Sequence, residues 1–418
     1  MTTDAAPHPF RIADFRFYWA ARLTSTLAQN AMVVVIGWQV YDIARQTMDQ
    51  RAAAMQLGYI GLVQFVPLLL LTLVVGWTAD RLDRRWIARA AVLLEAACAI
   101  ALALLTWYDK TTLADLFIVA GLLGVARAFA SPALQALAPN LVPRGSLPAA
   151  IALSSIAWQA GAIAGPALGG LLYAVKPHLP YTLAAALFIL ALTSLLLIRP
   201  VPRPVIDTGA SPWRRMGEGL GYVRKNRLIL GAISLDLFAV LLGGVTAMLP
   251  IYARDILAVG PIGVGALRMA PAVGAVLVAL WFSARPLRTN VGVKMLWGVG
   301  VFSLSTIAFG FSRWMPFSLA CLVLLGAADM FSVYVRQSLV QLHTPDAMRG
   351  RVGAVSTLFV SASNELGEAR SGFFAALVGP VAAVVLGGAG AVAVTMLWAK
   401  YFPELRRART FDPPGSIR

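Results

Sequence analysis

The chain has 418 residues, of which 59% are hydrophobic and 13% are charged, and its formal net charge is +16. Soluble domains carry about 25% charged residues, so this composition excludes an ordinary soluble protein. It also excludes a disordered chain, which needs many charges and few apolar residues. We therefore expect a polytopic membrane protein, in which about 20 apolar residues form each spanning helix.

The basic excess has two interpretations. A positive balance is typical of nucleic-acid binding. Here, however, Lys and Arg lie in short clusters between apolar runs, a pattern that the positive-inside rule explains better. We therefore expect a multi-pass protein of the bacterial inner (plasma) membrane with both termini in the cytoplasm, and no nucleic-acid partner. The N-terminal MTTDAAPHPFRIADFRF lacks the apolar core of a signal peptide, so the first apolar segment is expected to remain as a spanning helix.

Twelve apolar segments are predicted to span the membrane. In chain order they lie at 16–43, 54–79, 86–108, 112–138, 149–175, 180–198, 228–253, 262–284, 291–311, 314–341, 351–377 and 381–402. Several exceed the length that a bilayer requires, which indicates tilt or protrusion into water. The predicted fold class is an all-α membrane protein with twelve transmembrane helices.

A long connection at mid-chain suggests two halves. We predict an N-terminal six-helix bundle at 1–198, a cytoplasmic linker at 199–227, and a C-terminal six-helix bundle with a cytoplasmic tail at 228–418. Residues of mixed type recur between the halves at nearly constant spacing: Pro67, Trp77, Arg81, Gln135, Gly165 and Gly170 as Pro271, Trp281, Arg285, Gln337, Gly367 and Gly372. Such a parallel repeat of six spans is a known transporter architecture and predicts two pseudo-symmetric bundles.

The segment after the second span carries a recognisable signature. It reads GWTADRLDRR, with Gly76, Asp80, Arg81, Arg84 and Arg85. This string resembles the loop signature of the major facilitator superfamily, G-x-L-A-D-R-x-G-R-R, from which it departs at Thr78 and Asp83. The resemblance implies a cytoplasmic latch, in which the carboxylate meets a helix N-terminus and a cation. The alternative is an ordinary positive-inside loop.

The fifth span carries GAIAGPALGG, with Gly161, Gly165, Pro166, Gly169 and Gly170. The first, second and fourth of these share one helix face, where another backbone could approach closely. The string is similar to the antiporter signature of the same superfamily, which implies export. Generic helix packing is the alternative.

Longer strings indicate a narrower group. They are DFRFYWAARL, RAFASPALQALAPNLVP, GAADMFSVYVRQSLVQLHTPDAMRGRV, SASNELGEARSG and LWAKYFPELRR, and they come from both halves. They resemble the enterobactin-exporter-like permeases and related drug-efflux proteins. The resemblance implies the major facilitator fold and the efflux of a siderophore or drug, without naming the substrate.

Charges within the spans are functional candidates, because an ionised group is costly in hydrocarbon. Asp236 lies in the seventh span, where the resemblance implies a central cavity; it is interpreted as a titrating site or as the partner of a cavity arginine. Arg127 lies where superfamily antiporters place an arginine for proton coupling. Asp329 and Arg336 share one face of the tenth span and could form an ion-pair relay or a lock.

Glu365 and Glu368 lie three residues apart on one face of the eleventh span. Two carboxylates that close repel each other, which favours holding a proton and suits proton coupling. A structural pair satisfied by Arg336, Arg370 or a backbone group is the alternative. Glu95 and Arg268 show no obvious partner in the sequence and are interpreted as structural.

A substrate path needs polar anchors among apolar contacts. The candidates are Gln29, Asn30, Gln64, Trp158, Gln159, Phe238, Phe359 and Asn364. Each of them could equally serve helix–helix contact.

Several kinds of chemistry lack support in the sequence. No Gly-Lys pair exists, so the ATP-binding phosphate loop is missing. Cys98 and Cys321 indicate neither a disulfide framework nor a metal site, and the three histidines fall in terminal or loop positions. We expect no catalytic residue, no metal, no cofactor and no enzymatic activity.

The expected function is secondary active export of a small amphipathic molecule, a drug or a siderophore-like metabolite, by proton antiport and alternating access. Its expected partners are the lipid bilayer, that substrate and protons, and the protein is expected to be a monomer. An uncoupled facilitator, a lipid flippase or a metal exporter in the same scaffold is the alternative, and a non-transporting membrane receptor is a further one.

Overall fold

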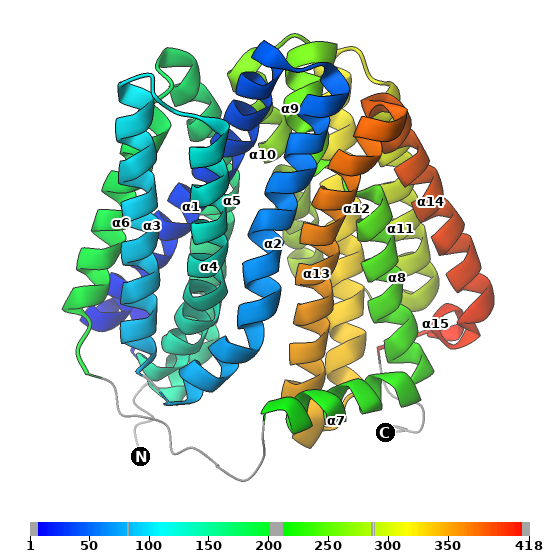
Figure 1. Cartoon of the computed structure of the whole chain (residues 1–418). Coiled ribbons are helices and arrows are strands. Elements are labelled where there is room, and N and C mark those ends of the chain that lie inside the picture. The colour runs from blue at the N-terminus through cyan, green and yellow to red at the C-terminus, as the bar shows by residue number, and fades with distance from the viewer. Residues whose placement is uncertain (1–6, 82, 201–211, 286, 288, 412–418) are drawn as a thin grey trace. The chain divides into compact units, whose positions relative to one another are not determined.

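A computed structural model describes residues 7–81, 83–200, 212–285, 287 and 289–411. Every regular element in that part of the chain is a helix, as Figure 1 shows. The long helices of the first half are α1 (Ala13–Thr47), α2 (Gln50–Arg81), α3 (Arg84–Trp107), α4 (Leu113–Leu137), α5 (Leu147–Val175) and α6 (Leu179–Leu197). Short 3₁₀ turns lie at Pro9–Arg11, Ala138–Asn140 and Arg144–Ser146.

The second half begins with α7 (Pro212–Lys225), which packs against α13 and α8 at one end of its bundle (Figure 1). The helices that follow are α8 (Arg227–Gly243), α9 (Leu249–Ile251), α10 (Gly260–Ala284), α11 (Val291–Phe311), α12 (Met315–Leu342), α13 (Asp346–Val378), α14 (Pro380–Tyr401) and α15 (Pro403–Arg407). A 3₁₀ turn at Thr246–Met248 precedes α9, and a π-helical turn at Tyr252–Ile256 follows it.

The seventh predicted span is interrupted. Its helix α8 stops at Gly243, and Gly244 is extended. The chain then continues through short 3₁₀, α- and π-helical turns up to Ile256. Irregular backbone at membrane depth is tolerated where it is buried in protein, and Tyr252 and Ile251 are fully buried.

Among the described residues, ten helices are long and apolar enough to cross a bilayer. The long helices α1 and α13 are not among them, because their sequences carry more polar and charged residues. The predicted all-α fold is confirmed, while the count of twelve spans remains a prediction. Large apolar side chains such as Leu104, Ile118 and Leu197 are exposed, as expected for helices that face lipid.

Local sequence explains several helix starts. Thr112 and Asp115 form a reciprocal capping box at the start of α4. The Asn226 side chain accepts from the backbone N–H of Ile229 at the start of α8. These caps satisfy amide groups that have no partner inside the helix.

The chain forms two compact units. Unit 1 comprises the described residues of Met1–Ile43, Val63–Thr208 and Val259–Met269, and unit 2 those of Ala44–Leu62, Gly209–Ala258 and Ala270–Arg418. The first part of α2 thus groups with the second half of the chain, and the start of α10 groups with the first. The division at 1–198, 199–227 and 228–418 therefore remains a prediction.

Candidate functional site

A buried ion pair lies at the centre of unit 2. Arg336 on α12 places Nη2 3.4 Å from Oδ2 of Asp236 on α8. Asp236 is 5% exposed and Arg336 is 3% exposed. Asp329, two turns before Arg336 on the same helix, interacts electrostatically with both. The structure therefore brings together three of the residues that the sequence singles out, as two carboxylates around one guanidinium.

This acidic cluster of Asp236, Asp329 and Arg336 is incompletely neutralised. Nη1 of Arg336 donates to the Ser356 hydroxyl on α13 at 3.3 Å, whereas its buried Nε has no hydrogen-bond partner. One arginine then neutralises at most one of the two carboxylates. Ionising both acids beside a single cation is unfavourable in a medium of low dielectric constant. A proton shared between the two acids would relieve that imbalance.

Two further predicted coupling carboxylates lie on α13. Glu365 and Glu368 are half-buried and have polar interactions of their own. Arg370 places its guanidinium 5.4 Å from the ring centre of Phe374, and its Nε is buried without a hydrogen-bond partner. A role of either glutamate in proton coupling remains a prediction.

Unit 1 has a polar cluster of different chemistry. Nη1 of Arg127 on α4 donates to Oε1 of Gln64 on α2 at 3.4 Å. Gln29 on α1 donates from Nε2 to Oε1 of Glu95 on α3 at 2.6 Å. Glu95 is fully buried and interacts electrostatically with Arg127. Glu95 thus has a side-chain partner that the sequence does not reveal, since 66 residues separate it from Gln29.

The other predicted cavity residues fall into several places. Nδ2 of Asn30 donates to the Thr26 carbonyl of its own helix at 2.9 Å. On α5, Trp158 is exposed and Gln159 half-buried, and Asn364 on α13 is exposed. Phe238 packs on Trp398 of α14, whereas Phe359 packs on a separate apolar cluster around Val355. The assignment of these residues to a substrate cavity remains a prediction.

The glycines of the fifth span position α1. A methyl group added at Gly161 would lie 2.8 Å from the amide nitrogen of Leu27, and one added at Gly165 would lie 2.7 Å from its carbonyl oxygen. At Gly169 it would lie 2.9 Å from the carbonyl oxygen of Ala31. Pro166 is buried within α5, and Gly170 faces Pro261 and Gly265 at the start of α10. The close approach of α1 to α5 requires these small residues, as in other membrane helix pairs.

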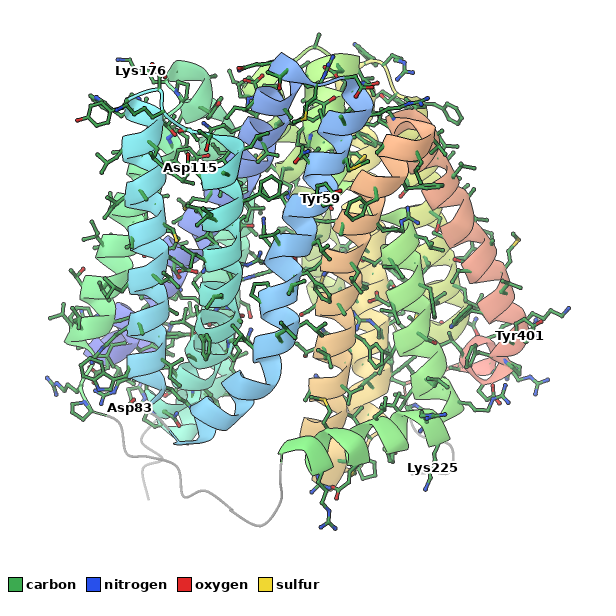
Figure 2. The ribbon with its side chains drawn as sticks, viewed as in Figure 1. Tyr59, Asp83, Asp115, Lys176, Lys225 and Tyr401 are labelled. Carbon is green, nitrogen blue, oxygen red and sulfur yellow. The ribbon has the colours of Figure 1, made fainter. Side chains whose placement is uncertain are left out.

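The predicted latch is described in part. The side chains of Gly76, Asp80 and Arg81 lie outside the described residues. Asp83 caps α3: its Oδ1 accepts from the backbone N–H of Arg85 at 3.0 Å, and its Oδ2 pairs with Nη2 of Arg85 at 2.6 Å. These hydrogen bonds from Arg85 lower the pKa of Asp83 below its ordinary value. In Figure 2, Asp83 lies at the end of unit 1 opposite to Asp115 and Lys176.

Two arginines at the start of α3 hold the end of α6. Nη1 of Arg85 donates to the carbonyl of Ile198, and Nη2 of Arg89 donates to the carbonyl of Leu195 at 2.9 Å. Cations are favourable at a helix C-terminus, where carbonyls lack partners. Arg84 is half-buried and has polar interactions of its own. This end of unit 1 is therefore organised by one arginine of the signature, Arg85, and by Arg89 one helical turn after it.

In the part of the chain that the structure describes, no group of three or more His, Cys, Asp or Glu side chains could hold a metal ion. Cys98 and Cys321 are free and buried.

Comparison with known proteins identifies the family of the chain. A family model described as transmembrane secretion effector, within the major facilitator superfamily, matches residues 4–412. The enterobactin exporter EntS of Escherichia coli O1:K1 / APEC is 26% identical over 407 residues, covering 96% of this chain and 94% of that protein. EntS of Citrobacter koseri is 28% identical over 415 residues, with the same coverage.

Solved transporters share the fold at low sequence identity. A POT family transporter in complex with 5-aminolevulinic acid superposes with a TM-score of 0.73 at 14% identity, covering 97% of this chain and all of that one. An occupied, inward-facing bacterial homologue of the human lysosomal transporter Spinster superposes with a TM-score of 0.73 at 15% identity, covering 96% and 99%. These matches establish the architecture, and the chain belongs to the transmembrane secretion effector family of the major facilitator superfamily, whose members are transporters and not enzymes.

Proposed function

We propose that this protein is a proton-driven exporter of a small amphipathic molecule, and that it resides in the bacterial inner membrane with both termini in the cytoplasm. Membership of a transporter family supports secondary transport, and the similarity to enterobactin exporters supports the outward direction and a siderophore-like substrate. The absence of a Gly-Lys pair leaves no phosphate loop to use ATP. The remaining energy sources are an ion gradient and the substrate's own gradient, and we favour the ion gradient.

One observation carries the coupling to protons. Buried Asp236 pairs with the guanidinium of Arg336, and half-buried Asp329 interacts electrostatically with the same guanidinium. When one acid holds a proton, the cluster is balanced; when both are ionised, it has an excess negative charge that favours a rearrangement or an incoming cation. Protonation therefore supplies the change in charge that alternating access requires.

Export by antiport requires that substrate and protons stabilise different states. Protons entering from outside would neutralise the acidic cluster and favour release of the substrate. Loss of the protons to the cytoplasm would restore the charged state that rebinds it. Alternating access between the two pseudo-symmetric halves would then move substrate outward and protons inward.

Flux in reconstituted vesicles tests the proposal. Proteoliposomes that contain the purified full chain and enterobactin as the probe should show rapid enterobactin movement against an imposed pH gradient. A protonophore should abolish the stimulation. Flux that is unchanged by the gradient and by the protonophore would instead indicate an uncoupled facilitator and would reject the antiport mechanism.

A further inference from the structure

A second carboxylate, separate from the acidic cluster of unit 2, is buried in unit 1. Glu95 is 0% exposed. Its Oε1 accepts one hydrogen bond, from Nε2 of Gln29, and its buried Oε2 has no hydrogen-bond partner. A buried carboxylate with an open lone-pair site is expensive to retain unless it has a use.

The surroundings of Glu95 leave it few ways to be neutralised. Of the helices that pack on α3, α4 contributes Arg127, which also donates to Gln64, and α6 has no charged residue between Leu179 and Leu197. Its own helix contributes the thiol of Cys98, and α1 contributes the neutral amide of Gln29. The neighbour in direct hydrogen-bond contact is therefore an amide, which carries no charge.

The amide makes the contact directional. An ionised carboxylate only accepts hydrogen bonds, so Gln29 must turn its NH₂ group towards Glu95 and keep its carbonyl oxygen for another partner. A protonated carboxyl group donates through its O–H, so the amide turned by half a rotation accepts that bond with its oxygen and offers its NH₂ group elsewhere. Gln29 is half-buried rather than fully buried, and the inference assigns its second polar group to contact with the substrate.

We propose that Glu95 is a second proton-binding group and that Gln29 is a positioning residue on the substrate path. When Glu95 takes a proton, the amide of Gln29 turns, and the group that it presents to the substrate changes from a hydrogen-bond acceptor to a hydrogen-bond donor. The inference rests on the proposed export function. It assigns a substrate class, namely molecules that present hydroxyl or ammonium donors to the oxygen of Gln29 when Glu95 is ionised.

In this switch, protonation of Glu95 opposes substrate binding, as antiport requires. A proton taken from water forms the O–H bond of Glu95, the amide turns, and its NH₂ group then opposes the donors of the substrate. Substrate binding and protonation thereby exclude each other, and the proton returns to water when the carboxyl group ionises again. Arg127, which attracts the ionised form, keeps that form accessible in the buried position.

Infrared difference spectroscopy on the full chain in lipid nanodiscs tests proton binding without any transported probe. A pH titration should reveal the C=O band of a protonated carboxyl group that Glu95→Gln removes and Asp236→Asn keeps. Glu95→Asp, which retains a carboxyl group with a shorter side chain, should shift the band; this variant also serves if Glu95→Gln fails to fold. An identical titrating band in wild type and Glu95→Gln, or an unshifted one in Glu95→Asp, would overturn the proposal.

The role of Gln29 is tested in proteoliposomes with enterobactin as the probe. Gln29→Leu should keep a titrating Glu95 band. The factor by which the pH gradient stimulates enterobactin flux should fall at least about tenfold, which corresponds to a coupling free energy of about 1.4 kcal/mol. Gln39→Leu is the matched control, because Gln39 lies on the same helix and accepts from the Tyr181 hydroxyl at 2.6 Å; it should change neither the band nor the pH dependence. Equal loss in both variants would overturn the switch.

The two proposals fail in different ways. A Glu95 band that titrates in a protein whose enterobactin flux ignores the pH gradient would reject proton-driven export and support proton binding at Glu95. Proton-coupled flux in a protein without such a band would reject the inference and support the export function.

Discussion

The two units hold their buried acids by different means. In unit 2, Asp236 is paired with Arg336 at 3.4 Å, and Asp329 interacts with the same guanidinium. In unit 1, Glu95 is held by the neutral amide of Gln29 at 2.6 Å, while Arg127 acts on it without a hydrogen bond between them. A paired acid changes the charge of its surroundings when it takes a proton. An amide-held acid changes the direction of a hydrogen bond.

This difference suggests a division of labour. In the proposed mechanism, the acidic cluster of unit 2 responds to the proton gradient through its charge and drives the conformational change. The Glu95–Gln29 pair of unit 1 would respond by reversing a hydrogen bond and would sense the substrate. Substitutions at Asp236, Arg336, Gly165 and Asp83 probe this difference between the units.

The largest effect is expected on coupling. Asp236→Asn should reduce gradient-driven enterobactin flux by at least about tenfold, since the variant can no longer gain and lose charge at this position. Downhill exchange of enterobactin should continue, because the scaffold is intact. Both rates are measured in the same proteoliposomes. Equal loss of driven flux and exchange would mean that Asp236 is structural and that the acidic cluster of unit 2 does not drive the conformational change.

The second test compares the two arginines by stability. Arg336→Ala leaves two buried acids without their cation and should cost roughly 3–5 kcal/mol of unfolding free energy. Arg127→Ala should cost only about 1–2 kcal/mol, because Gln29 still holds Glu95. Thermal unfolding in detergent micelles at neutral pH measures both. The combined variant Asp236→Asn with Arg336→Gln should recover part of the loss, and equal costs for the two arginines would remove the distinction between the clusters.

The third test moves α1 relative to α5. Gly165→Ala adds a methyl group that would lie 2.7 Å from the Leu27 carbonyl oxygen and 2.8 Å from Cβ of Asn30, next to Gln29. We expect a loss of about 1–3 kcal/mol and a weakened Gln29–Glu95 contact. Gly300→Ala on α11 is the control, because nothing lies within 4 Å of its added methyl group. Both are compared by thermal unfolding, and a neutral Gly165→Ala would show that α1 has room to shift.

The smallest effect concerns the cap of the helix that carries Glu95. Asp83→Ala should cost about 1 kcal/mol, since it removes the bond to the Arg85 amide. Asp83→Asn keeps an acceptor at this position and should cost less.

The effect of Asp83 also depends on pH. Because the hydrogen bonds from Arg85 lower the pKa of Asp83 in the folded protein, its stabilising contribution is complete above the ordinary aspartate pKa of about 4. It is lost as the pH falls through the lowered native value. The difference in unfolding temperature between wild type and Asp83→Ala should therefore be constant above pH 5 and shrink in stronger acid. A difference that does not shrink would assign the effect to packing.

The fold could be predicted from the sequence because hydropathy and basic clusters act locally. The predicted third span at 86–108 corresponds to α3 at Arg84–Trp107, and the predicted ninth span at 291–311 matches α11. The break in the seventh span after Gly243 was not predicted, because an apolar run keeps its hydropathy whether or not its backbone is regular.

The sites could be predicted only as single residues. Charge in an apolar run identifies Asp236, Asp329 and Arg336, and the structure supplies their grouping. The sequence revealed no partner for Glu95, and its interpretation as structural remains a prediction: the structure supplies Gln29 as a hydrogen-bond partner from α1, 66 residues away, which no spacing in the sequence encodes. The departure at Asp83 from the superfamily signature also has a local explanation, because Asp83 caps α3.

Proton release on substrate binding shows whether substrate and protons exclude each other at Glu95 and at Asp236. Enterobactin added to the purified protein in weakly buffered micelles should release protons, after subtraction of the signal without protein. Glu95→Gln and Asp236→Asn should each reduce the release, and the combined variant should abolish it. Proton uptake on binding, or an undiminished release from the combined variant, would contradict the account.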